Sequence, residues 1–87
     1  MAYHVEFSKP AQKEYEKLDP AIKQRVSDAI VGLEMDPRPS GCKVLKGQRS
    51  FYRIRIGKFR IIYDVQDKVL IVLVFRIAKR DEVYRGF

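Results

Sequence analysis

The sequence has very few cysteine and histidine residues. Its 87 residues include a single cysteine, Cys42, and a single histidine, His4. One cysteine cannot form an internal disulfide, and the two residues together supply no cluster of metal ligands. We therefore expect no metal, no small-molecule cofactor and a reducing, cytoplasmic setting.

Long apolar runs are also missing from the sequence. The longest apolar run, Val69–Phe75, has the length of a strand, whereas a membrane span needs roughly 20 apolar residues. Residues 1–7 show no basic segment followed by an apolar stretch, so we expect no secretory signal and no membrane association. A chain of this length has room for one domain, residues 1–87, with one modest core.

Acidic residues are scarce in the second half of the chain. Residues 1–42 hold 6 Lys and Arg against 7 Asp and Glu, a net charge of −1. Residues 43–87 hold 12 against 4, a net charge of +8. Such an uneven basic charge indicates a polyanionic partner, either nucleic acid or an acidic protein, although a merely solvated basic surface is the alternative.

The first half of the chain predicts one strand and two helices. Residues 3–7 alternate between apolar and polar, as a half-buried strand does. Ser8 followed by Pro10, and Asp19 followed by Pro20, are typical helix starts, and the second helix should end before Pro37. Its apolar stripe consists of Ile22, Val26, Ala29, Ile30 and Leu33. The two helices form a hairpin with one apolar side.

The second half predicts strands. Residues 36–42 read as a loop because of their prolines and glycine. Three β-rich runs follow, at 51–56, 59–65 and 69–77, with connections short enough for hairpins, and Val44-Leu45 is a candidate edge strand. The expected fold class is α+β: a mostly antiparallel sheet of about four strands, with the N-terminal strand and helical hairpin packed on one face.

A two-residue turn at Gly57-Lys58 fixes which residues of the first hairpin share a face. It places Arg55 opposite Arg60 and puts both, with Arg53, on the face away from the core. Like charges directly opposite each other destabilise a sheet, and an anionic ligand would relieve that cost. Removing either charge should then leave stability unchanged or slightly higher. The alternative is that the three arginines are solvated positions on an open face.

A second basic group follows the last strand. Arg76, Lys79 and Arg80 come at its end, and Tyr84 lies four residues beyond Arg80. Whether this group joins the first one depends on geometry that the sequence does not fix.

Two segments carry a resemblance to a known family. The runs YRIRIGKFRIIY, residues 52–63, and KRDEVYR, residues 79–85, are similar to the pattern of RelE-type toxins of the RelE/ParE superfamily. The N-terminal strand and helical hairpin match as well, so the resemblance covers nearly the whole chain. It implies a microbial-ribonuclease-like fold and ribosome-dependent cleavage of messenger RNA in the decoding site, with an acidic RelB-like antitoxin as partner.

The resemblance also implies roles for individual residues. RNA carries its own nucleophile, the 2′-hydroxyl, so the protein must align it, stabilise transition-state charge and manage two protons. Arg60 is expected to stabilise that charge, Arg80 to act on the leaving 5′-oxygen, and Tyr84 to handle a proton or stack on a base. The expected phosphate-binding residues are Arg53, Arg55 and Lys79. Arginines stand at 53 and 55 where the best-known pattern has lysines, and arginine cannot act as a general base.

Several alternatives stay open at this point. A ParE-like toxin that binds DNA gyrase would have the same fold but no catalytic activity. A basic nucleic-acid-binding module would explain only the positive charge. The identity of the general base is open too. His4 lies on the first strand, and we expect it to be structural.

Overall fold

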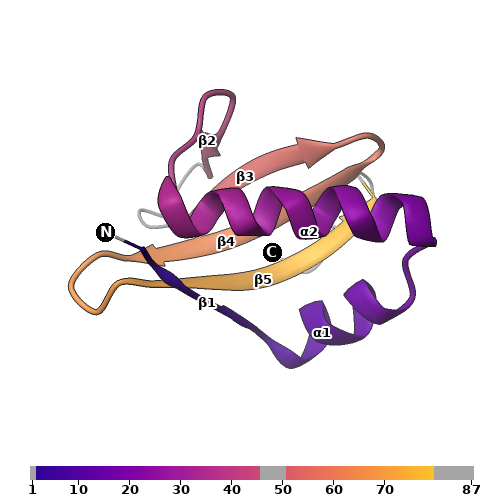
Figure 1. Ribbon diagram of the computed structural model, residues 1–87, viewed down its shortest axis with the longest axis horizontal. Coiled ribbons are helices and arrows are strands. Elements are labelled where there is room, and N and C mark those ends of the chain that lie inside the picture. The colour runs from indigo at the N-terminus through magenta and orange to yellow at the C-terminus, as the bar shows by residue number, and fades with distance from the viewer. Residues whose placement is uncertain (1, 46–50, 80–87) are drawn as a thin grey trace.

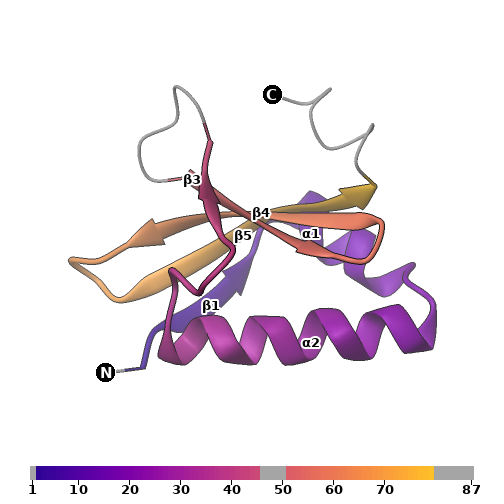
Figure 2. The same ribbon diagram turned by 90° about the horizontal axis from the view of Figure 1, so that it is seen from above.

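The fold is one mixed sheet with two helices on one side. The computed structural model describes residues 2–45 and 51–79. In chain order the elements are β1 (His4–Phe7), α1 (Lys9–Glu16), α2 (Pro20–Met35), β2 (Lys43–Val44), β3 (Phe51–Ile56), β4 (Phe59–Gln66) and β5 (Ile71–Lys79). Both helices lie against the same face, as Figures 1 and 2 show. None of the helices in the described ranges is long and apolar enough to cross a membrane.

The α+β prediction is confirmed, with five strands instead of about four. The strand order is β1-β5-β4-β3-β2. Pairing is antiparallel from β2 to β5, whereas β1 joins the sheet beside β5 in parallel. The N-terminal strand therefore belongs to the sheet itself, and the chain reaches α1 from the sheet's outer edge.

Both helices start where the sequence predicts. The Ser8 hydroxyl accepts the N–H of Ala11 at 3.1 Å and donates to the carbonyl of Phe75 at 2.7 Å. This single side chain thus caps α1 and attaches its first turn to β5. Asp19 occupies the N-cap position of α2, but its side chain makes no capping hydrogen bond.

The main core lies between the helices and the sheet. The side chains of Val26, Leu33 and Tyr63 are fully buried in it. Tyr52 stacks on Tyr63 with 5.8 Å between ring centroids, and the Tyr63 hydroxyl donates to the carbonyl of Pro37 at 2.8 Å. Burial raises the pKa of that hydroxyl. Both tyrosines are packing residues.

The first hairpin has the predicted register. Arg55 lies opposite Arg60, and Ile56 lies opposite Phe59. Gly57 has φ +59° at the first of the two turn positions, a conformation that glycine adopts without steric cost. A Cβ at Gly57 would also stand 3.3 Å from Nη1 of Arg25, which reaches over the turn from α2.

A bulge interrupts the second hairpin. Ile62 lies opposite Arg76 and Tyr63 opposite Val74, which leaves Phe75 as an extra residue in β5. Val74, before the bulge, and Ile77, after it, both lie in the main core on the helix side. Ala78 lies in a separate apolar cluster with Ile62. The bulge therefore exchanges the two faces along the last part of β5.

A polar network joins four segments at the end of the sheet where β4 turns into β5. Arg38, which follows α2, makes two hydrogen bonds to Asp67, at 2.7 and 3.2 Å, and one to the Tyr52 hydroxyl at 2.8 Å. The Tyr3 hydroxyl donates to the same carboxylate at 2.7 Å. The bonds from Arg38 hold the pKa of Asp67 below its ordinary value, and the bond to Asp67 raises the pKa of Tyr3.

This network predicts an acid-sensitive contribution to stability. Because the folded-state pKa of Asp67 is depressed, its ionised form stabilises the fold above the unfolded pKa of about 3.9. That contribution is lost as pH falls through the folded-state pKa. Wild type should unfold at higher urea than Asp67→Asn at pH 7, and the gap should close below about pH 4. Asp28→Asn, on an exposed part of α2, is the control, and a gap that persists unchanged in acid would contradict the assignment.

Candidate functional site

The predicted arginines gather on the sheet face away from the helices. Arg53 and Arg55 come from β3, and Arg60 comes from the neighbouring strand β4. Their strand neighbours Ile54 and Ile61 point into the main core, so the alternation of side chains directs the arginines outward. We call Arg53, Arg55 and Arg60 the arginine face.

The three arginines differ in exposure. Arg55 is exposed, Arg53 is half-buried, and Arg60 is only 5% exposed. Arg60 lies on the same side of the sheet as a small second core, in which Ile62 and Ala78 are buried with Leu45, Phe51 and Phe75 packed against them. The alternative of three solvated positions on an open face is therefore wrong for Arg60.

This arrangement concentrates positive charge where water screens it less. The guanidinium of Arg60 is largely withdrawn from solvent, so its field on a nearby anion is stronger than that of a surface arginine. Within residues 2–45 and 51–79, Arg53 and Arg55 form no ion pair. Asp64, on the same face of β4, accepts a hydrogen bond from Gln66 at 3.0 Å. The expected binding of phosphate by Arg53 and Arg55 stays a prediction.

The second basic group does not join the arginine face as far as the structure describes it. Lys79 lies opposite Phe59, on the helix side of the sheet, because the bulge has exchanged the faces of β5. Arg80 and Tyr84 lie outside the described residues. Their expected roles stay predictions.

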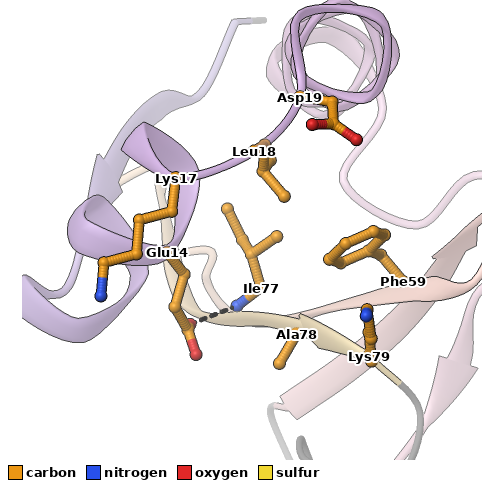
Figure 3. Close-up of a pocket in the computed structure, with 8 residues that line it drawn as sticks. All are labelled: Glu14, Lys17, Leu18, Asp19, Phe59, Ile77, Ala78 and Lys79. Carbon is orange, nitrogen blue, oxygen red and sulfur yellow. Dashed lines mark hydrogen bonds between the residues drawn. The ribbon is translucent and has the colours of Figure 1, made fainter.

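Arg76 has a structural role. Its guanidinium donates to both oxygens of Glu14 on α1, the shortest bond being 2.8 Å. Glu14 also accepts the backbone N–H of Ile77 at 2.8 Å, as Figure 3 shows. Helix α1 is therefore tied to β5 directly after the bulge. From the sequence we grouped Arg76 with the basic residues at the strand end, and no local pattern indicated this contact.

The histidine lies far from the arginines. His4 is on β1, at one edge of the sheet, with β5 and β4 between it and β3. Its side chain is 72% exposed and lies 3.5 Å from Glu6. In the described part of the chain, no group of three or more His, Cys, Asp or Glu side chains could hold a metal ion.

Comparisons with known proteins agree with this architecture. The family model described as the ParE toxin of the type II toxin-antitoxin system parDE matches residues 5–84. The mRNA interferase toxin RelE of Escherichia coli is 32% identical over 97% of this chain and 92% of its own length. The archaeal RelE-RelB complex from Pyrococcus horikoshii contains a chain with TM-score 0.83 and 28% identity, over 94% of this chain and 99% of that one.

The isolated RelE toxin of Escherichia coli also has this fold, with TM-score 0.82 and 30% identity over 98% of this chain and 94% of its own. The family match and these relatives show that the chain is a toxin of the RelE/ParE superfamily. The chain belongs to the family of ParE toxins of type II toxin–antitoxin systems, with RelE toxins among its relatives.

The tie between α1 and β5 can be tested by mutation. Glu14→Gln removes the carboxylate that Arg76 and the Ile77 N–H share, so we expect a loss of about 1–3 kcal/mol in unfolding free energy. This is less than for a fully buried pair because the two side chains are 24% and 23% exposed. Urea unfolding measures it, with Glu16→Gln on the same helix as the control. Equal losses in the two variants would show that the contact stabilises nothing specific.

Proposed function

We propose that this protein is the toxin of a type II toxin–antitoxin system and a metal-independent endoribonuclease. It cleaves messenger RNA in the decoding site of the ribosome and so inhibits translation in the cytoplasm. The arginine face is the observation that carries the proposal, because three guanidinium side chains of a kind that binds phosphate come together on one side of the sheet. Relatives that are named mRNA interferases support the choice of reaction.

The reaction needs no nucleophile from the protein. The 2′-hydroxyl of the RNA attacks the adjacent phosphorus, its proton leaves, and the 5′-oxygen of the next nucleotide departs with a proton. The products are a cyclic phosphate and a 5′-hydroxyl end. The protein contributes alignment of the attacking oxygen and stabilisation of charge on the phosphate oxygens.

The residues divide these tasks. Arg53 and Arg55 hold phosphates through paired hydrogen bonds, and Arg60 stabilises the charge that develops in the transition state. Arg80 acts on the leaving oxygen, and Tyr84 handles a proton or stacks on a base, as the family resemblance implies. The expected phosphate contact of Lys79 lies on the other side of the sheet from the arginine face.

The cognate partner is an acidic antitoxin. A basic half with a charge of +8 steers an acidic chain toward the arginine face and holds it there, which blocks the phosphate site. Several solved relatives are toxin–antitoxin complexes of the RelB–RelE type.

Inhibition of DNA gyrase is the second candidate, because the matching family model is that of the parDE toxin. A gyrase inhibitor has no use for a phosphate site on the sheet, so the arginine face favours the ribonuclease. A supercoiling assay with purified gyrase separates the two activities.

Arg55 provides the cleanest test of the arginine face. Because Arg55 is exposed and lies opposite another arginine, Arg55→Ala should keep or slightly raise stability, by a few tenths of a kcal/mol. Cleavage should fall about 10- to 100-fold. A thermal melt and a single-turnover rate on programmed ribosomes, taken on one preparation, measure both. Lys68→Ala, in the turn at the other end of the sheet, is the control, and full activity of Arg55→Ala would place the site elsewhere.

Arg60 needs a milder substitution. Its burial means that Arg60→Ala removes packing as well as charge and should lower stability, contrary to the expectation from like-charge repulsion alone. Arg60→Lys keeps the positive charge but loses the planar guanidinium group with its paired N–H donors. Its melting temperature should stay closer to wild type than that of Arg60→Ala, while cleavage should fall about 100-fold.

Proton handling is tested at Tyr84. No arginine of the site can give up a proton, so Tyr84→Phe should slow single-turnover cleavage far more than it weakens binding to programmed ribosomes. Tyr15→Phe, on α1, is the matched control. Wild-type cleavage by Tyr84→Phe would assign the proton transfer to another group.

A further inference from the structure

A pocket of about 370 Å³ lies on the helix side of the sheet, at the end where β3 turns into β4. The connection from α1 to α2 forms one wall, and the ends of β4 and β5 form the other (Figure 3). Its volume is within the range of small-molecule sites. The arginine face does not include any of its lining residues.

The lining combines an aromatic ring with unused polar groups. Phe59 faces Leu18 and Ile77 across the pocket, with Lys79 beside the ring and the Asp19 carboxylate directed toward the pocket from the start of α2 (Figure 3). Phe59 is half-buried, so part of its ring is accessible to a ligand.

Asp19 and Glu14 differ in what they already bind. Glu14 is committed to Arg76 and to the backbone of Ile77. Among the described residues, the Asp19 side chain makes neither a capping bond nor an ion pair. Its carboxylate is therefore available to a ligand that brings N–H donors.

We propose that this pocket holds an unstacked nucleobase of the substrate RNA, an inference that rests on the proposed function. The base stacks on Phe59, its exocyclic amine donates to Asp19, and a flanking phosphate binds Lys79. An acidic peptide fits less well because Asp19 and Glu14 repel it. An apolar peptide side chain would leave the charges of Asp19 and Lys79 unused.

The position of the pocket connects it with the arginine face. Phe59 and Arg60 are neighbours on β4 and point to opposite faces of the sheet. The sheet ends here at the Gly57-Lys58 turn, directly before Phe59, and Lys58 is exposed. One RNA strand that passes around this end can place a phosphate on the arginines and a nearby base in the pocket.

The test is a scan with abasic nucleotides. The toxin is bound to programmed ribosomes whose messenger RNA has 2′-deoxy sugars in the decoding-site codon, so that no cleavage occurs. One abasic nucleotide at a time replaces a base in that codon or within three nucleotides on either side. At one position, wild type should lose affinity about 5- to 100-fold, the range for one base stacked on an aromatic ring.

Phe59→Leu provides the decisive comparison. It should lose a similar factor on intact RNA and show no further loss at that same abasic position, because the stacking partner is already gone. Asp19→Asn, with Asp28→Asn as its control, should reduce the preference for bases that carry an exocyclic amine. Thermal melts confirm that the variants are folded.

The proposal would be wrong if, at every position, the affinity lost through the abasic nucleotide simply added to the affinity lost through Phe59→Leu. A Phe59→Leu variant that binds RNA normally and binds its antitoxin weakly would also overturn it, because the pocket would then belong to the antitoxin. Arg55→Ala separates this failure from that of the proposed function. If Arg55→Ala still loses cleavage, the ribonuclease assignment stands without the base pocket.

Discussion

The register of the β3–β4 hairpin is the constraint on which both faces of the sheet depend. Because strand side chains alternate, a slip of one residue would bring Arg53, Arg55 and Arg60 into the core and expose the isoleucines. The turn at Gly57 prevents the slip, since its positive φ suits a two-residue connection and Arg25 leaves little room for a side chain there. One tight turn thus sorts apolar side chains toward the helices and arginines away from them.

The bulge at Phe75 sets a second constraint with the opposite effect. It moves Ile77 into the main core and carries Lys79 to the helix side, away from the arginine face. Ser8 and Glu14 secure this region by binding the carbonyl of Phe75 and the N–H of Ile77. Helix α1 therefore supports the strand where its geometry is irregular, and the space beside that support is the proposed base pocket.

Local signals in the sequence were enough for much of the fold. The two Pro-marked helix starts and the Gly57 turn each act within a few residues, so the helices, the hairpin and the arginine face could be predicted. The bulge, the parallel pairing of β1 with β5 and the burial of Arg60 depend on contacts between distant segments. Glu14 shows the same limit, because its partners lie more than 60 residues away in sequence. The roles of Arg80 and Tyr84 rest on the family resemblance.

The central claim is that this fold uses its arginine face to cut messenger RNA during translation. Mapping RNA ends in cells after induction of the protein tests this most directly. If the protein cuts messenger RNA during translation, new 5′-hydroxyl ends should appear inside reading frames that are being translated, and none in the same messages when their start codons are removed. Growth arrest with an unchanged pattern of RNA ends would contradict this claim.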